Sequence, residues 1–238
     1  WIANLKDEAA RIEAKFRVCG KKPVIWHAED GSEEPAGFRI EEGRTSLSLD
    51  LDRCQSVFVM FTEDTSDGSL TLPVNEPETV AILEGPWEVS FQEGRGAPGT
   101  AVVEELKSLS LSDVPGIKYF SGKATYSKSF SIRKKDLKKG RMFLDLGEVK
   151  DIASVRVNGT EMGTVFTHPF KVEITGALRR GRNEVEIEVT NVWHNRIVGD
   201  MQPGVRDKIT YTRIDFFTAE KPLLPSGLLG QVRIVSLQ

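Results

Sequence analysis

The chain has 238 residues with 32 basic and 35 acidic side chains, so its formal net charge is only −3. Such a balance gives no basic surface for nucleic acid or an anionic membrane, and neither is expected as a partner. No apolar run approaches the roughly 20 residues that a membrane-spanning helix needs. Cys19 and Cys54 allow one disulfide at most, too few for a disulfide-stapled scaffold. What remains is a globular chain with one large or two modest cores.

Residues 1–80 are expected to form a small antiparallel β-module followed by a linker. About five short strands alternate apolar and polar side chains, with turn residues between them. So few strands make a thin sandwich, and the chain opens at Trp1 without an initiator Met or a signal region. Two readings stay open: the module is complete, or it is the tail of a preceding domain. The strand candidates are 12–18, 24–27, 38–40, 47–51 and 57–61, and the stretches 30–35, 62–69 and 73–77 are expected to be turns and linker.

Residues 81–238 are predicted to form a second domain, an all-β jelly-roll sandwich. About eight or nine strands alternate in the period of two, and Asn158-Gly159 is a strong hairpin signal. A parallel α/β fold is excluded, because its crossovers need helical patterns between the strands. The run Lys134–Gly140 is predicted to be a charged, solvated corner. The strand candidates are 87–91, 102–106, 117–130, 141–147, 153–157, 162–166, 170–174, 183–193 and 231–235.

The strand at 183–193 leads to the candidate site. Three aliphatic side chains alternate with three glutamates, which predicts a half-buried strand whose glutamates lie on a solvated face. The same parity places Asn191 and Trp193 on the apolar row, where an amide needs hydrogen-bond partners. The aliphatic side chains are Val185, Ile187 and Val189, and the glutamates are Glu184, Glu186 and Glu188.

An aromatic ring with an amide, a guanidinium and a carboxylate beside it suits a polyhydroxylated ligand. In this interpretation Trp193 stacks on a pyranose face while polar groups that follow it bond to the hydroxyls. The alternative is that Trp193 plugs the end of the sandwich and Arg196 merely pairs with Asp200. Two further aromatic residues are second-choice platforms, although such side chains more often fill cores. The candidate carbohydrate-binding residues are therefore Trp193, Asn195, Arg196, Asp200, Asn191, Trp87 and Tyr119.

Other chemical motifs are weak. The loop Gly94–Gly99 matches G-x-G-x-x-G, but strands without helices surround it, which predicts a hairpin loop and no dinucleotide site. The histidines and cysteines lack metal-ligand spacing, so no metal site or cofactor is expected. A structural calcium ion on Asp113 or Asp200 stays open, without an Asp-rich spacing to support it. No nucleophile elbow occurs, and no carboxylate pair can be selected for glycoside hydrolysis, so no catalytic residue is assigned.

Several motifs in residues 83–238 resemble the galactose-binding-like jelly roll of glycoside hydrolases of the β-galactosidase superfamily. Two of them, 191–200 and 225–230, are similar to the C-terminal region of large bacterial glycoside hydrolases of family 106, the α-L-rhamnosidases. Residues 40–61 resemble the tail of a preceding β-domain more loosely. One departure is Leu111, where the family pattern leads us to expect Trp. The other motifs are 85–91, 116–126, 144–147, 153–159 and 169–170.

The resemblance implies a non-catalytic accessory β-sandwich whose parent chain carries a catalytic barrel, with its carboxylate pair, upstream. It also implies a carbohydrate partner, a plant or host glycan such as a rhamnose-containing one, and a parent that is periplasmic or secreted in a bacterium. Two alternatives stay open: an independent carbohydrate-binding module and a ligand-free interdomain scaffold. An open groove at Trp193 and Arg196 would favour binding, whereas burial under residues 225–230 would favour the scaffold.

Overall fold

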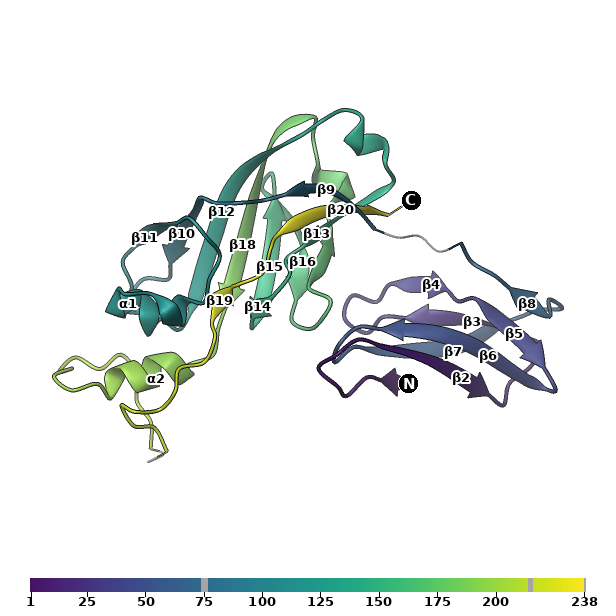
Figure 1. Ribbon diagram of the computed structural model, residues 1–238, viewed down its shortest axis with the longest axis horizontal. Helices are drawn as coiled ribbons and strands as arrows, with labels where there is room; N and C mark the ends of the chain where they lie inside the picture. Colours follow the sequence, from purple (N-terminus) through teal and green to yellow (C-terminus); the bar gives the residue numbers. More distant parts are fainter. Residues whose placement is uncertain (74–76, 214–215, 238) are drawn as a thin grey trace. The chain divides into compact units, whose positions relative to one another are not determined.

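The computed structural model describes residues 1–73, 77–213 and 216–237 and divides the chain into two compact units (Figure 1). Unit 1 contains Trp1–Glu76 with Thr167–Pro169, and unit 2 contains Pro77–Phe166 with Phe170–Gln238. All described strand pairs are antiparallel, so the predicted all-β fold is confirmed. Part of the predicted linker at 73–77, residues 74–76, lies outside the described residues. No helix in the described part of the chain is long and apolar enough to cross a membrane.

Unit 1 consists of two four-stranded sheets with strand orders β1-β7-β3-β4 and β2-β6-β5-β8. Its core consists of apolar side chains that alternate with polar ones along the strands, as the sequence predicts. Leu47, Leu49 and Leu51 of β6 are buried in it. The stretch 30–35 differs from the prediction of a turn, since its last three residues form a short strand that pairs with β3. The strands are β1 (Ile2–Ala3), β2 (Ala10–Phe16), β3 (Lys21–Trp26), β4 (Glu33–Pro35), β5 (Phe38–Glu41), β6 (Arg44–Leu51), β7 (Ser56–Asp64) and β8 (Ser69–Leu70).

Unit 2 is a sandwich whose six-stranded sheet has the order β11-β10-β12-β18-β15-β16 and whose four-stranded sheet has the order β17-β13-β20-β9. β14 pairs with β19 separately. The strands are β9 (Glu78–Ile82), β10 (Trp87–Phe91), β11 (Thr100–Val103), β12 (Lys123–Ile132), β13 (Arg141–Asp145), β14 (Val149–Lys150), β15 (Ile152–Val157), β16 (Thr160–Val165), β17 (Lys171–Glu173), β18 (Gly181–Thr190), β19 (Gly227–Leu228) and β20 (Arg233–Leu237).

Strand β18 lies in the middle of the larger sheet, between β12 and β15. Val185, Ile187 and Val189 are at most 1% exposed, while Glu184 and Glu186 face solvent. Each buried aliphatic side chain contributes about 1.5–3 kcal/mol relative to an exposed one. This row therefore fixes the register of the sheet, since a slip of one residue would bury the glutamates instead.

The short helices interrupt two predicted strands. The predicted strand at 117–130 begins instead with helix α1 (Pro115–Lys118), and β12 starts only at Lys123. The predicted extension of β18 to Trp193 ends at Thr190, and helix α2 (His194–Asp200) follows. The 3₁₀ turns are η1 (Leu109–Leu111), η2 (Asp136–Lys138) and η3 (Thr175–Ala177).

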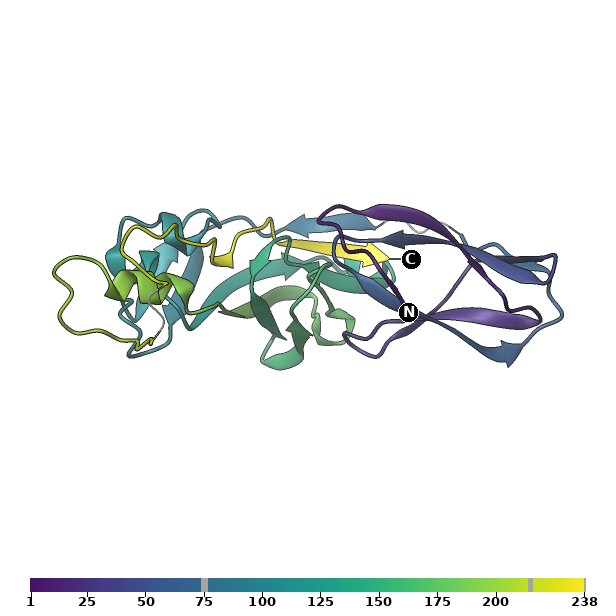
Figure 2. The same ribbon diagram turned by 90° about the horizontal axis from the view of Figure 1, so that it is seen from below.

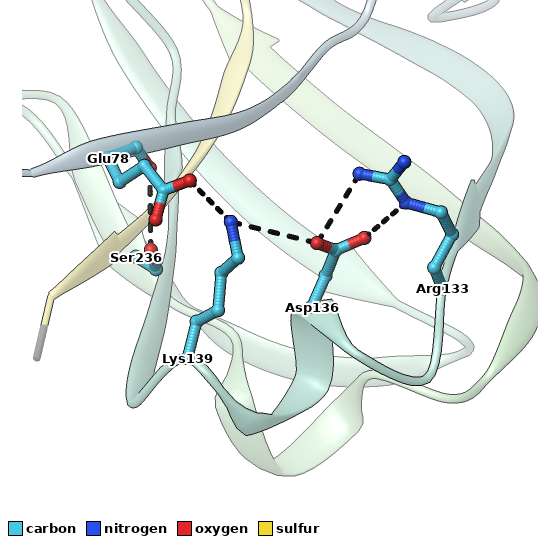
Figure 3. A network of polar contacts seen from close by, with 5 residues as sticks. All are labelled: Glu78, Arg133, Asp136, Lys139 and Ser236. Atoms are coloured by element: carbon cyan, nitrogen blue, oxygen red, sulfur yellow. Dashed lines mark hydrogen bonds and ion pairs between the residues drawn. The ribbon is translucent and has the colours of Figure 1, made fainter.

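A chain of charges crosses the corner that the sequence predicts to be solvated (Figure 3). Asp136 is only 2% exposed, and Arg133 donates to it over 2.6 Å. The Arg133 hydrogen bond lowers the pKa of the Asp136 carboxyl below its usual value. Lys139 lies 3.7 Å from Asp136 and also pairs with Glu78 of β9, whose carbonyl accepts a bond from Ser236 of β20. The corner thus connects η2 to two strands of the smaller sheet.

Two asparagines connect the β15–β16 turn to the segment that joins β17 and β18. Asn158, at φ 51°, and Gly159 form the predicted hairpin turn. The Asn158 amide donates to Asn183, which is fully buried. Asn183 donates to the carbonyls of Arg179 and Gly181 and accepts from the Arg179 N–H. Every hydrogen-bonding group of the Asn183 amide therefore has a partner.

Replacing Asn183 with Ala should destabilise unit 2 by about 2–3 kcal/mol, because the buried partners of its amide lose their hydrogen bonds. Urea unfolding followed by circular dichroism measures this. Glu184→Ala on the wet face of the same strand is the matched control, expected to stay within about 0.5 kcal/mol. Equal effects of both substitutions would contradict the network's role.

The β3–β4 hairpin of unit 1 contains a histidine that pairs with an acid. Glu34 lies 3.3 Å from His27 Nε2, and this hydrogen bond raises the pKa of the imidazole above 6.5 despite opposing partial burial. The nearby Asp30 and Glu29 raise it further.

Because the folded-state pKa of His27 is raised, its contribution to stability is complete below pH 6.5 and is lost as the pH rises through the raised value. An NMR titration of His27 should show a pKa above 6.5 that falls in Glu34→Gln. In wild type, unit 1 should become less stable as the pH rises from 6.5 through the raised pKa of His27, and Glu34→Gln should remove this dependence on pH. An unchanged titration would contradict the pairing.

Candidate functional site

The candidate site lies at the end of unit 2 where β18 leads into α2, and both views place α1 and α2 at this end (Figures 1 and 2). Trp193 is the N-cap residue of α2 and remains 44% exposed. It therefore does not plug the sandwich, because the chain leaves the strand three residues earlier and turns the indole outward.

The indole of Trp193 has a cationic neighbour that the sequence did not single out. The guanidinium carbon of Arg95 lies 4.5 Å from the centroid of the Trp193 ring, within the range of a cation–π contact. Arg95 belongs to the Gly94–Gly99 loop, which joins β10 and β11 as the predicted hairpin connection. The glycine pattern was visible in the sequence, but nothing there indicated that the loop reaches Trp193.

Asn195 is 2% exposed and forms reciprocal bonds with the backbone of Leu224. Its Nδ2 donates to the Leu224 carbonyl and its Oδ1 accepts from the Leu224 N–H, both over 2.8 Å. A third contact, 3.5 Å long, reaches Ser226 Oγ. The predicted role of Asn195 as a sugar ligand stays a prediction, and in the structure its amide holds Leu224, in the α2–β19 loop (residues 201–226) that follows the helix, against α2.

Arg196 and Asp200 are also buried, 7% and 1% exposed, and pair with each other over 3.0 Å. Asp200 Oδ2 accepts three bonds, from the N–H groups of Ile209 and Thr210 and from the Thr210 hydroxyl. The helix turns both groups inward, so their predicted contact with sugar hydroxyls stays a prediction and the structure shows the pairing that was its alternative. They join α2 to the α2–β19 loop instead.

The remaining candidates also support the frame. Asn191 donates to the Phe120 carbonyl and accepts from the Gly122 N–H, so its amide has the partners that the sequence argument demanded. Tyr119 is partly buried against α2, where a Cβ on Gly199 would lie 2.6 Å from its own Cβ. Trp87 is fully buried in the core and offers no platform, which corrects its second-choice assignment.

Two cavities lie elsewhere on unit 2. One, of about 470 Å³, lies on the wet face of the larger sheet and is lined by hydroxyl, carboxylate and guanidinium groups, including Ser154, Arg156 and Glu186. The other, of about 570 Å³, lies beside Trp87 and the 104–106 segment. Among the described residues, no three His, Cys, Asp or Glu side chains gather closely enough to hold a metal ion. The oxygens of Asp200, considered for calcium, face Arg196 and the 209–210 backbone.

Comparisons with known proteins now give this fold a context. Residues 117–211 match the family described as glycosyl hydrolase 2 galactose-binding domain-like. A solved rhamnosidase from Novosphingobium sp. PP1Y is 44% identical, with a TM-score of 0.92 over 98% of this chain and 22% of that chain. A Formosa agariphila protein provisionally named beta-glucuronidase is 36% identical over 177 residues, 64% of this chain and 15% of that protein.

The chain thus spans less than a quarter of either relative. The matched domain, the antiparallel sandwich and the rhamnosidase similarity confirm the resemblance that the motifs indicate. This chain is a β-sandwich region similar to part of glycoside hydrolases, and residues 117–211 of its larger unit match a galactose-binding-like family.

Proposed function

We propose that this chain is the non-catalytic accessory region of an α-L-rhamnosidase-like glycoside hydrolase, where it supports a catalytic domain of the same parent chain and contacts carbohydrate through Trp193. The observation that carries the proposal is the 44% identity to a rhamnosidase over 98% of this chain. Sequence similarity at this level, together with a shared fold, supports a shared place in the parent enzyme. The carbohydrate contact rests on the geometry around Trp193.

Trp193 is suited to this contact because it is exposed and its neighbours are fixed. The residues on either side of it, Asn191 and Asn195, have their amides bonded to the backbone of other segments. An indole held on such a frame loses little conformational freedom when a ligand packs on it. Its flat apolar surface matches the C–H face of a pyranose, while the sugar hydroxyls stay in water.

The burial of the neighbouring polar groups favours a second candidate function, a ligand-free interdomain scaffold. Asn195, Arg196 and Asp200 all bind parts of their own chain. In this alternative the exposed Trp193 packs against another domain of the parent chain. The two functions differ in whether this chain alone has affinity for a glycan.

Isothermal titration calorimetry with a rhamnose-containing oligosaccharide separates the two functions. We expect binding that Trp193→Ala weakens about tenfold or more, since about 1.4 kcal/mol of contact energy is lost. Phe166→Ala, which removes an exposed aromatic ring on another part of unit 2, is the control and should leave the affinity unchanged. A wild-type chain without affinity for any glycan in a screen would leave the scaffold as the better account.

The frame itself is tested at Asn195. Asn195→Ala leaves the Leu224 N–H and carbonyl without their partners at a cost of about 1–3 kcal/mol, so the α2–β19 loop should open more often. Limited proteolysis should cleave residues 201–226 several-fold faster. Asn195→Asp keeps an acceptor for the Leu224 N–H but places a buried carboxylate oxygen against the Leu224 carbonyl, so its cleavage should be at least as fast as that of Asn195→Ala. Unaltered cleavage in both variants would show that other contacts hold the loop.

A further inference from the structure

The guanidinium of Arg95 is a charged group beside Trp193 to which no function has yet been assigned. It contacts the Trp193 ring and has no hydrogen-bond or carboxylate partner among the residues that the structure describes. The other arginine nearby, Arg196, is buried and neutralised by Asp200. Arg95 is therefore a guanidinium that lies beside Trp193 and remains available to a ligand.

The position of Arg95 is defined by tight backbone packing. A Cβ on Gly122, at φ 147°, would lie 3.3 Å from Arg95 Cγ, so the arginine stem runs close to that segment. On the other side, a Cβ on Gly116 would lie 2.2 Å from the Gly96 carbonyl oxygen. Gly96, at φ 81°, also leaves room for the Arg196 and Ile209 side chains. The hairpin loop is thus packed between α1 and α2, and it holds the guanidinium beside the indole.

We propose that the Trp193–Arg95 pair recognises an acidic carbohydrate, a glycan that carries a uronate carboxylate. This inference deepens the carbohydrate contact of the proposed function and rests on it. A guanidinium presents parallel N–H donors that match the two oxygens of a carboxylate, and such charge-assisted bonds are about twice as strong as neutral ones. Arg95 covers one face of the indole, and the part of the ring that stays exposed supplies apolar area for the sugar ring beside the guanidinium.

A neutral sugar would use this pair less fully. Its hydroxyls bond to a guanidinium that water already solvates well, so little is gained by exchange. A carboxylate gains the Coulomb attraction of the opposite charge in addition, and the apolar indole face reduces the access of water on one side. Arg95 is therefore the residue that determines the preference between acidic and neutral glycans.

The test measures binding of a uronate-containing oligosaccharide and of the same oligosaccharide with its carboxyl groups reduced to alcohols. Wild type should bind the acidic form about tenfold more tightly, and the difference should shrink at high salt. Arg95→Gln should lose that difference, and Arg95→Lys should keep part of it as a point charge. Arg182→Gln, on the wet face of β18 away from the loop, is the matched control for lost charge.

The outcomes separate this inference from the proposed function. Equal affinity of the wild type for both forms, with both lost in Trp193→Ala, would overturn the acidic preference and leave the carbohydrate contact standing. No affinity for either form, or for neutral glycans, would overturn both. The wild-type comparison needs no variant, so it remains decisive even where Arg95→Gln fails to fold.

Discussion

The buried row of β18 is the constraint on which the rest of unit 2 depends. Val185, Ile187 and Val189 fill the space between the two sheets, while β12 and β15 bond to the strand along both edges. Because successive side chains alternate, this row fixes which residues of the strand face the core. The candidate site begins where that alternation stops, at Thr190, and polar contacts hold Asn195, Arg196 and Asp200 beyond it.

Those polar contacts explain why Asn195, Arg196 and Asp200 are buried while the nearby ring of Trp193 is exposed. In a helix, residues three and four apart share a face, so Arg196 and Asp200 point the same way and pair. Asn195 shares the inner side and bonds to Leu224. Trp193, at the N-cap, already has helical backbone angles, but its side chain remains 44% exposed. The helix thus buries the polar side chains that cluster in the sequence, where they bind their own chain, and leaves the indole exposed.

Most of the fold could be predicted from the sequence, and less of the site could. Alternation identified the buried rows of β6, β10 and β18, and Asn158-Gly159 identified its hairpin, because these signals are local. Helix α2 was not predicted. The apolar–polar alternation of β18 continues to Trp193, and the seven residues of the helix that follow are too few to show a helical period. The approach of Arg95 to Trp193 joins residues that are far apart in the chain, which local patterns do not contain.

The same contacts that bury Asn195, Arg196 and Asp200 within the chain support the recognition that we propose at Trp193. A mobile polar cluster would have to be ordered when a sugar binds, and that entropy cost would offset much of the contact energy. Here the two amides and Asp200 Oδ2 already have hydrogen-bond partners within the chain, so little further ordering is needed. Any preference between glycans at Trp193 would then come from a group other than these buried side chains. Arg95 has that position, since its loop is packed in place while its donors stay free of partners among the described residues.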